Sequence, residues 1–331
     1  KLEEYINKFK PEYYYSNSDT EYSYGKRLSS YDEVLKYDES DLIIIALSGI
    51  EGIDPTISSI KQGRKILIAN KESLVAGGDI LVELSQNNNA EIIPLDSEHS
   101  AIWQCIKNED HGSIDRVILT ASGGALRDHS PEELKKITVK DVLNHPTWKM
   151  GKKITVDSST LINKVFEVQE ASNLFSLPLD KVDVLFHRQS LIHGLAEFQD
   201  GNILAVISYP DMKIPILYGL YYPDRFSSSK IKKIDFKTIS SLSFESFPDE
   251  KLSWFNFGMK LLNSSKLAPS FLVGSDQAAV EMFLKKKISY TGMLDIMERA
   301  YSKFDFAKEY NLETIKETVQ RSYLNTLEET E

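Results

Sequence analysis

The sequence is poor in several features that mark particular classes of protein. One cysteine, Cys105, among 331 residues excludes an internal disulfide framework and suits a reducing compartment, the cytoplasm or, in a eukaryote, a plastid-type organelle. No apolar run approaches the roughly 20 residues of a membrane span, and no signal peptide is evident. Basic residues are outnumbered, 39 against 49 acidic ones, and the net charge of −10 argues against general binding to nucleic acid or anionic membranes.

A glycine-rich nucleotide loop is also missing. None of the 16 glycines falls into a G-x-G-x-x-G pattern. The first residue is Lys1, and Leu2, Tyr5, Ile6 and Phe9 already recur at the helical period. A chain that opens inside an amphipathic helix predicts an incomplete N-terminal domain. The alternative is a natural N-terminal helix that follows removal of a methionine or a tag.

Residues 1–95 alternate strand-like and helix-like segments. Three short apolar runs predict buried strands: 42–47, 65–69 and 91–95. A helix is expected over 71–86, and another after the first strand, where Asp54 is predicted to cap a helix with Pro55 at its first position. Strand and helix in alternation are typical of a parallel α/β sheet.

The rest of the chain predicts two further units. Residues 96–224 mix one long helix over 160–174 with three strands, an α+β pattern: 116–121, 182–186 and 203–209. Residues 225–249 read as a linker. Residues 250–331 are helical throughout and predict a small C-terminal helical domain.

Asp96 and Glu98 directly follow the third predicted strand. Ligands gather at the carboxyl ends of strands in open α/β sheets. In an extended backbone the spacing of two puts both carboxylates on one face, where a divalent cation would relieve their repulsion. The alternative is that Asp96 caps a helix and Glu98 lies in its first turn. The residues leave both interpretations open.

A second polar group lies on the predicted helix that begins at residue 160. Asn163 and Glu167 are one turn apart, and Lys164 is a neighbour of Glu167 on the same face. An amide, an ammonium and a carboxylate together suit an anionic, hydroxylated ligand and a metal. A solvated helix face with one weak ion pair is the alternative.

Two glycine-containing segments complete the set. Ser122-Gly123-Gly124 follows a strand, and its backbone N–H groups could approach a phosphate closely. Trp148 lies between a proline and a glycine, which suggests a flap that closes over a ligand, although tryptophan more often anchors a loop. His187 and His193 have no cysteine partner nearby, so carboxylates that bind Mg²⁺ or Mn²⁺ fit better than a zinc site.

Taken together, the chain resembles the 1-deoxy-D-xylulose 5-phosphate reductoisomerase family over nearly its whole length. Seven motifs occur in the family's order: Asn70-Lys71-Glu72-Ser73, Asp96-Ser97-Glu98-His99, Ser122-Gly123-Gly124, His145-Pro146-x-Trp148-x-Met150-Gly151, Asp157-Ser158, Asn163-Lys164-x-x-Glu167 and Pro210-Asp211-Met212. The resemblance implies an α/β fold with a partial Rossmann-like NADPH-binding domain, a central α+β catalytic domain and a small C-terminal helical domain. Their expected bounds are 1–95, 96–224 and 250–331, with 225–249 as the linker.

The resemblance also implies a role for each matching residue. The metal, Mg²⁺ or Mn²⁺, would be bound by Asp96, Glu98 and Glu167. Residues that contact the reacting end of the substrate would be Lys71, Ser97 and Glu98. The substrate phosphate would be bound by Ser122, Ser158, Asn163 and Lys164, with His145 closing over it. The flap and the pocket wall would be Trp148 and Met212. Contacts beside NADPH would come from Asn70, Glu72 and Gly151.

The implied activity is that of an NADP-dependent oxidoreductase. A homodimer would rearrange and reduce 1-deoxy-D-xylulose 5-phosphate, a phosphosugar, to 2-C-methyl-D-erythritol 4-phosphate in non-mevalonate isoprenoid precursor biosynthesis. Without a Gly-rich turn, about one βαβ unit is missing, and we expect this stretch to bind NADPH poorly. The alternatives are a non-catalytic or NADPH-deficient relative or fragment that binds a phosphosugar and a metal, and a metal-dependent isomerase or aldolase without a nicotinamide.

Overall fold

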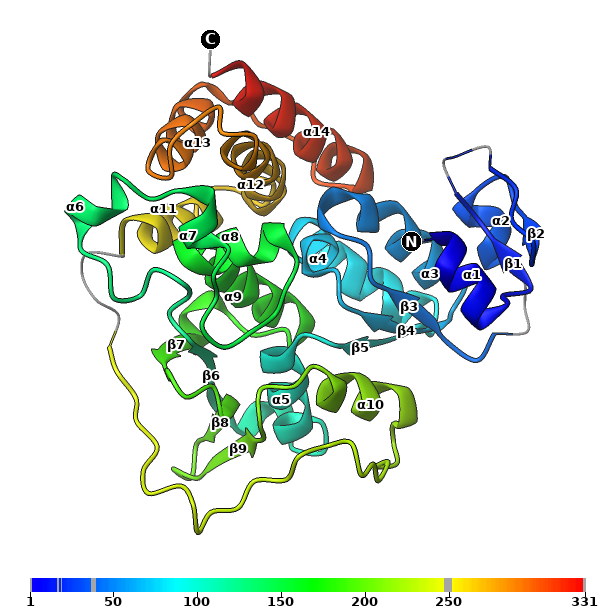
Figure 1. Ribbon diagram of the computed structural model, residues 1–331, viewed down its shortest axis with the longest axis horizontal. Coiled ribbons are helices and arrows are strands. Elements are labelled where there is room, and N and C mark those ends of the chain that lie inside the picture. Colours follow the sequence, from blue (N-terminus) through cyan, green and yellow to red (C-terminus); the bar gives the residue numbers. More distant parts are fainter. Residues whose placement is uncertain (1, 17, 19, 37–39, 247–251, 330–331) are drawn as a thin grey trace.

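The computed structural model describes residues 2–329 except 17, 19, 37–39 and 247–251. The boundary predicted between linker and C-terminal domain, at residues 249 and 250, lies outside the described residues, as does Lys1. The chain opens with helix α1 (Leu2–Phe9), a parallel pair of two-residue strands and helix α2 (Tyr31–Leu35). The pair is β1 (Tyr13–Tyr14) and β2 (Lys26–Arg27). This segment lies at one side of the molecule (Figure 1).

The first larger sheet is parallel, as predicted. Its strands are β3 (Ile43–Ile45), β4 (Lys65–Ile68) and β5 (Glu91–Pro94), in that order. Helix α3 (Ile53–Lys61), preceded by a 3-10 turn (Gly49–Gly52), links the first two strands, and α4 (Lys71–Asn87) links the second and third. The predicted cap at Asp54 is wrong: Gly52 is the N-cap and Asp54 is the second helical residue, because the 3-10 turn runs straight into α3.

The second sheet has four strands in the order β7-β6-β8-β9. The strands are β6 (Ile114–Ala121), β7 (Val182–Phe186), β8 (Ile192–Phe198) and β9 (Ile203–Ile207). Strand β6 pairs in parallel with β7 and antiparallel with β8, and β9 forms an edge. Strand β8 is not among the predicted strands, because its residues are nearly all buried and lack the alternation of apolar and polar residues that marks a half-buried strand. Helix α5 (Ser97–Ile106) leads from the first sheet to this one and packs on β8.

The predicted helix over 160–174 is confirmed as α9 (Ile162–Leu174), which begins two residues later, and a separate helix that was not predicted, α8 (Lys152–Thr160), precedes it. Helix α8 ends and α9 begins at Leu161, whose φ is +66°. A left-handed leucine is uncommon because its Cβ crowds the backbone. Its side chain packs with Ala121 and Phe186, so tertiary contacts hold a break that helix propensity does not predict.

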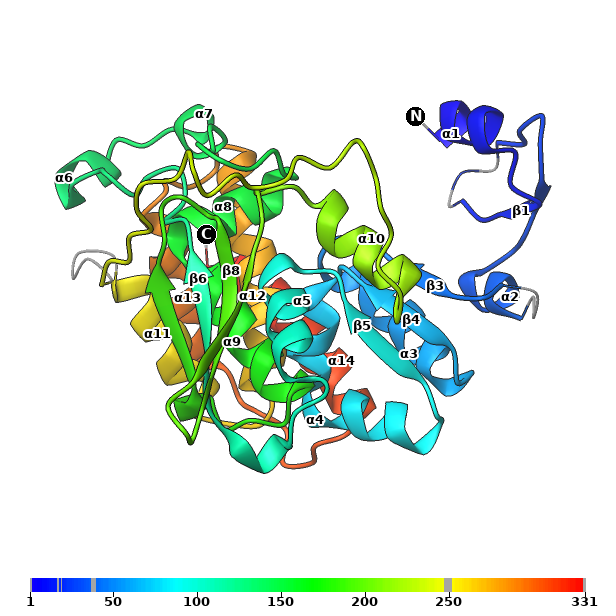
Figure 2. The same cartoon turned by 90° about the horizontal axis from the view of Figure 1, so that it is seen from below.

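Helices cover both sheets. Helix α10 (Lys213–Tyr221) packs its Ile216 and Leu220 on the three-stranded sheet, beside α5 (Figure 2). The connections between the strands and helices of this part also contain short elements: the 3-10 turns His111–Ser113 and Leu179–Lys181, and the helices α6 (Pro131–Leu134) and α7 (Val139–Val142). The C-terminal helices are α11 (Leu252–Leu262), α12 (Ala268–Leu284), α13 (Gly292–Lys303) and α14 (Leu312–Glu328). They share one hydrophobic core with α3, α4 and α9. Among the described residues, no helix combines the length and apolar character that crossing a membrane requires.

Gly274 allows α12 and α14 to approach closely. A Cβ at this position would lie 2.1 Å from the backbone oxygen of Val319. We therefore expect Gly274→Ala to destabilise the protein by about 1–3 kcal/mol, because backbone cannot move aside as a flexible side chain can. The measurement is the free energy of unfolding in urea. Gly112→Ala, whose Cβ would meet nothing closer than 3.6 Å, is the control. Equal stability of the two variants would contradict this account.

Candidate active site

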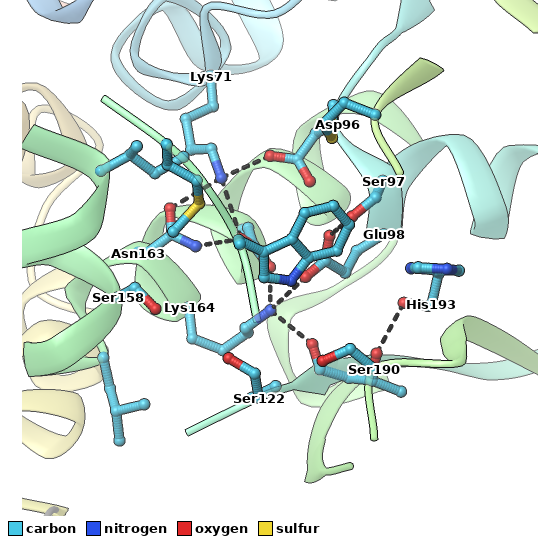
Figure 3. Close-up of a pocket in the computed structure, with 18 of the residues that line it drawn as sticks. Lys71, Asp96, Ser97, Glu98, Ser122, Ser158, Asn163, Lys164, Ser190 and His193 are labelled. Atoms are coloured by element: carbon cyan, nitrogen blue, oxygen red, sulfur yellow. Dashed lines mark hydrogen bonds and ion pairs between the residues drawn. The ribbon is translucent and has the colours of Figure 1, made fainter. Parts of the chain in front are cut away.

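A cavity of about 260 Å³ lies where the two sheets and α9 meet. Its walls come from the carboxyl ends of β4, β5 and β6, which carry Lys71, Asp96 and Ser122, and from α9 with Asn163 and Lys164 (Figure 3). Parallel strands end at the same edge of a sheet, so residues far apart in the chain meet there. The cavity therefore unites most of the side chains that the sequence motifs singled out.

Three carboxylates converge in this cavity. Asp96, Glu98 and Glu167 each offer an oxygen, and the three oxygens lie within 4.8 Å of one another. Of the two interpretations left open for this segment, the extended backbone is wrong, and the backbone follows the alternative: α5 begins at Ser97 and Glu98 lies in its first turn. Asp96 occupies the N-cap position, yet its side chain caps nothing and turns into the cavity instead. Three hard oxygen donors form a set that suits a divalent cation of the Mg²⁺ or Mn²⁺ type.

Lys71, at the start of α4, joins two of these carboxylates. Its Nζ lies 2.5 Å from Asp96 Oδ2 and 3.0 Å from Glu167 Oε1. The same Nζ donates to Asn163 Oδ1 at 2.9 Å. Asn163 in turn donates to Glu167, one helical turn further along α9. The predicted common face of Asn163 and Glu167 is thereby confirmed.

Lys164 holds the remaining carboxylate. Its Nζ donates to Glu98 Oε1 at 2.9 Å, to Glu167 Oε2 and to the backbone oxygen of Thr120 at 2.7 Å. Ser97 donates its hydroxyl proton to the other oxygen of Glu98. Lys164 is 4% exposed and Glu167 is 1% exposed, so this is a buried network rather than the solvated helix face that the sequence left open.

Burial and charge set the protonation of these groups. Burial alone would raise the pKa of Asp96, but the charge of Lys71 and the hydrogen bond and charge of His99 together outweigh burial and hold that pKa well below its usual range. The pKa of Glu98 rises to about 7, first because of burial and then because of the nearby charge of Glu167. The carboxylates likewise raise the pKa of Lys71 above its usual value against the effect of burial. When Glu98 is also ionised, the three carboxylates exceed the two lysine charges by one negative charge, which a divalent cation would more than offset.

The serine and glycine residues after β6 form the opposite wall. Ser122 and Ser158 both line the cavity. Gly124 has a φ of +71°, and a Cβ there would lie 2.6 Å from the backbone oxygen of Ser158. Only glycine allows the turn after β6 to approach α8 this closely. Two hydroxyls and the Lys164 ammonium thus face one space, a set of donors that suits a phosphate.

His145 reaches this wall from outside the cavity lining. Its Nδ1 accepts hydrogen bonds from the backbone N–H groups of Thr147 at 3.1 Å and Trp148 at 2.9 Å. The ring proton therefore lies on Nε2, which is 3.3 Å from Ser122 Oγ. Burial, and secondarily the charge of Arg127, lowers the pKa of His145 to about 4. His145 is a neutral hydrogen-bond donor to Ser122 near neutral pH.

Both residues predicted as flap and pocket wall line the cavity. Trp148 is half-buried in an irregular segment, and its ring meets the ring of His193 edge-on at 6.2 Å between centroids. Met212 is 37% exposed and also lines the cavity. Sequence reasoning missed His193 and Ser190 as cavity residues, since it weighed His193 only as a zinc ligand. Both residues follow β7 in the sequence and lie at the same sheet edge as Ser122, and this position could have indicated that they line the cavity.

The predicted NADPH residues do not line the cavity. Asn70 is fully buried and donates to the backbone oxygens of Leu47 at 3.0 Å and Gly49 at 2.8 Å. Glu72 lies 3.4 Å from Lys153 Nζ, and Gly151 is the exposed N-cap of α8. Asn70 shapes the turn after β3, at the carboxyl end of the parallel sheet. These assignments stay predictions.

The fold and this site define an α/β enzyme suited to a divalent cation and an anionic, oxygen-rich substrate. Three family models match the chain: 1-deoxy-D-xylulose 5-phosphate reductoisomerase over residues 2–78, the C-terminal domain of that enzyme over 92–175, and DXP reductoisomerase C-terminal domain over 207–323. The chain belongs to the 1-deoxy-D-xylulose 5-phosphate reductoisomerase family. A reductoisomerase from Geobacillus sp. (strain WCH70) is 39% identical over 89% of this chain and 78% of its own length. A reductoisomerase from Thermoanaerobacter pseudethanolicus is 40% identical over 88% of this chain and 78% of its own length.

Solved structures agree with the sequence relatives. A DOX-P reductoisomerase crystallised with NADPH, fosmidomycin and magnesium has a TM-score of 0.90 and 30% identity, and covers 99% of this chain and 88% of its own. The enzyme from Zymomonas mobilis with NADPH has a TM-score of 0.84 and 31% identity over 93% of this chain and 80% of its own. Both the α/β fold and the family implied by the motifs are confirmed.

The environment of His145 predicts how it titrates. Because its pKa of about 4 lies below the ordinary 6.5, the folded protein keeps this ring neutral where an unfolded chain would protonate it. Its contribution to stability is therefore present above pH 6.5 and is lost as the pH falls toward 4. Ring ¹⁵N NMR, assigned with His145→Gln, should show an Nε2–H tautomer unchanged between pH 8 and about 5. A midpoint near 6.5 would refute the assignment.

Proposed function

We propose that the chain catalyses the NADPH-dependent and divalent-metal-dependent rearrangement and reduction of 1-deoxy-D-xylulose 5-phosphate to 2-C-methyl-D-erythritol 4-phosphate, a step of non-mevalonate isoprenoid precursor biosynthesis. The observation that carries the proposal is the convergence of Asp96, Glu98 and Glu167 in a cavity that also holds Lys164 and Ser122. One end of this cavity suits a metal and the other a phosphate. The relatives named above support the reductoisomerase over the non-catalytic alternative.

The donor set fits the metal. Asp96, Glu98 and Glu167 would hold Mg²⁺ or Mn²⁺, whose preferred ligands are oxygens. The bound ion supplies Lewis-acid polarisation of the substrate carbonyl. Ser97 donates to Glu98 and Lys71 contacts Asp96, so each of these side chains keeps a carboxylate oriented toward the cavity. Such partners hold metal ligands in place.

Lys71 and Lys164 have different parts in the reaction. Lys71 Nζ holds a proton 2.9 Å from Asn163 Oδ1, beside the carboxylates, where it can support proton movement on the substrate's hydroxyl groups. The part of the cavity that we assign to the substrate phosphate is lined by Lys164, Asn163, Ser122 and Ser158. Binding of the non-reacting phosphate positions the reacting carbons and excludes water, with Trp148 and Met212 in the cavity wall.

NADPH supplies the hydride when it is bound. We place it at the carboxyl end of the parallel sheet, where ligands of such sheets bind. Asn70 orders the turn at Leu47 and Gly49 there, and a side chain on Gly151 would meet nothing within 4 Å, which leaves room beside α8. Asn70, Glu72 and Gly151 are the residues we assign to the cofactor side.

We assign the parts of the chain as the motifs suggest: a cofactor unit over 1–95, a catalytic unit over 96–224, a linker over 225–249 and a helical unit over 250–331. The three-stranded sheet, the four-stranded sheet and the last four helices support this division. We also propose that the protein acts in the cytoplasm. The relatives from Geobacillus and Thermoanaerobacter and the single cysteine support this location.

We also propose a homodimer through the edge strand β9. Ile203, Leu204 and Ile207 on this strand are 51%, 42% and 37% exposed. An edge strand leaves backbone N–H and C=O groups unpaired, and exposed apolar residues beside them favour association. A second copy of the chain that pairs edge to edge would cover both.

Loss of the carboxylates tests the function. We expect Asp96→Asn, Glu98→Gln and Glu167→Gln each to lower kcat/KM by at least about 100-fold, because each removes a metal ligand. The assay follows NADPH consumption with 1-deoxy-D-xylulose 5-phosphate and Mg²⁺ or Mn²⁺. Asp115→Asn, an exposed carboxylate on β6, is the control and should match the wild type.

Two outcomes would decide against this function. If the wild type consumes no NADPH with either metal even at saturating NADPH, the reductoisomerase assignment fails. If it converts the phosphosugar without consuming NADPH, an isomerase or aldolase is the better assignment.

A charge on the edge strand tests the dimer. Leu204→Arg should convert a dimer into a monomer, because burying an unpaired guanidinium in an apolar contact is costly. Leu324→Arg, on α14 with a similar exposure of 48%, is the control and should remain dimeric. Light scattering after size exclusion gives the mass of each. A wild-type monomer, or a dimer that survives Leu204→Arg, would contradict this interface.

A further inference from the structure

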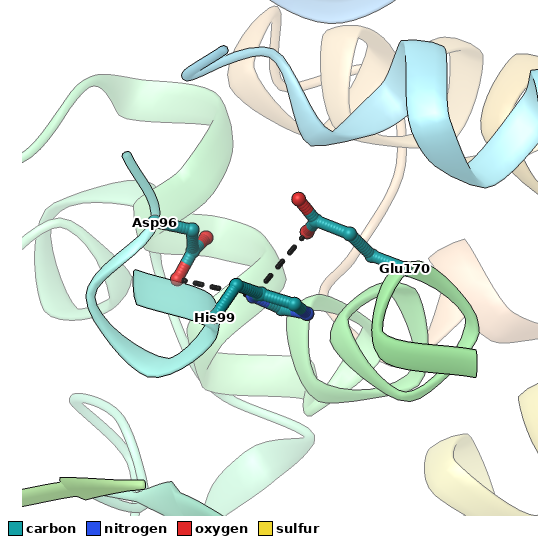
Figure 4. Close-up of side chains that lie close together, drawn as sticks. All are labelled: Asp96, His99 and Glu170. Carbon is teal, nitrogen blue, oxygen red and sulfur yellow. Dashed lines mark ion pairs between the residues drawn. The ribbon is translucent and has the colours of Figure 1, made fainter. Parts of the chain in front are cut away.

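A second ionisable cluster lies directly behind the three carboxylates. It consists of Asp96, His99 and Glu170 (Figure 4). Glu170 follows Glu167 by three residues on α9 and therefore lies on a neighbouring part of the same face. His99 is fully buried and Glu170 is 1% exposed. Neither residue has a part in the function proposed above.

One hydrogen bond and two ion-pair contacts fix the orientation of the His99 ring. Its Nε2 lies 2.9 Å from the backbone oxygen of Glu167. A carbonyl oxygen only accepts, so Nε2 carries a proton. The other nitrogen, Nδ1, points between two carboxylates, 3.7 Å from Asp96 Oδ1 and 3.5 Å from Glu170 Oε2. One ring thus contacts two of the three proposed metal ligands, Asp96 through its side chain and Glu167 through its backbone.

An unprotonated Nδ1 would be energetically unfavourable between these two carboxylates. A lone pair there would face two buried carboxylates, so the space between them requires a proton or a metal ion. His99 and Glu170 are not among the residues that line the cavity, which does reach Asp96. An enclosed space favours a proton.

We propose that Glu170 is a positioning residue that acts through His99. It holds the imidazole ring in place. The ring in turn orients the Asp96 carboxylate toward the metal and holds the backbone from which the Glu167 side chain projects. Outer partners of this kind typically change metal affinity by about 10–100-fold. The inference rests on the proposed function, because it assumes that Asp96 and Glu167 bind the metal.

The test measures Mn²⁺ binding by the full chain without NADPH or phosphosugar, by electron paramagnetic resonance of the free ion. We expect Glu170→Gln to weaken the Kd for Mn²⁺ by about 10–100-fold, because an amide keeps the size but not the charge. Glu170→Asp, which retains the charge, should recover part of the affinity. Gln169→Ala, at the neighbouring α9 position, whose side chain donates to Asn173, is the control. Thermal melts of the metal-free proteins separate lost stability from lost affinity.

Each outcome has one meaning. If the wild type binds no Mn²⁺, or if Asp96→Asn leaves Mn²⁺ binding unchanged, the proposed function itself fails. If the wild type binds one ion and Glu170→Gln binds it equally well, the positioning role is overturned and the function stands. A second wild-type equivalent that Glu170→Gln removes would mean a metal ion, not a proton, beside His99. If Glu170→Gln does not fold, His99→Gln decides, because it removes the ring through which Glu170 acts, and wild-type affinity in that variant overturns the proposal.

Discussion

The structure of the site depends on two buried lysines placed among carboxylates. Asp96, Glu98 and Glu167 lie too close together to remain ionised in a buried cavity by themselves, and Lys71 and Lys164 supply the opposing charges. Burying a charge is unfavourable unless it is paired, and removal of one partner from such a pair typically costs about 3–5 kcal/mol. The same constraint leaves the cluster with an excess of negative charge, which makes it a site for a cation.

The fold holds this cluster through elements that carry several members each. Helix α9 presents Asn163, Lys164 and Glu167 to the cavity on successive turns, and Glu170 to the ring behind it. The break at Leu161 turns α8 so that Ser158 faces the same cavity. Small movements of one helix would therefore change metal, phosphate and positioning contacts together.

A separate group of buried charged residues, around Lys153, joins the three parts of the chain. Lys153 on α8 lies 2.7 Å from Asp157 and from Asp276 of α12, and 3.4 Å from Glu72 of α4. Burial, followed by the charge of Asp276, raises the pKa of Asp157 to about 8. The C-terminal helices thereby contact the segment that carries Ser158 and Gly151. This contact connects the C-terminal helices to the cavity, although none of their described residues lines it.

Local sequence determined the periodic elements and the chemistry available. Apolar runs predicted β3 to β5 as a parallel sheet, and motif order led to the family and to cavity residues such as Lys71 and Asn163. Tertiary structure alone decided that Asp96 turns into the cavity rather than capping α5, and that Leu161 breaks a helix. It also recruited His99 and Glu170. Propensity and spacing act over a few residues, whereas these choices follow from burial and from charges brought together from distant parts of the chain.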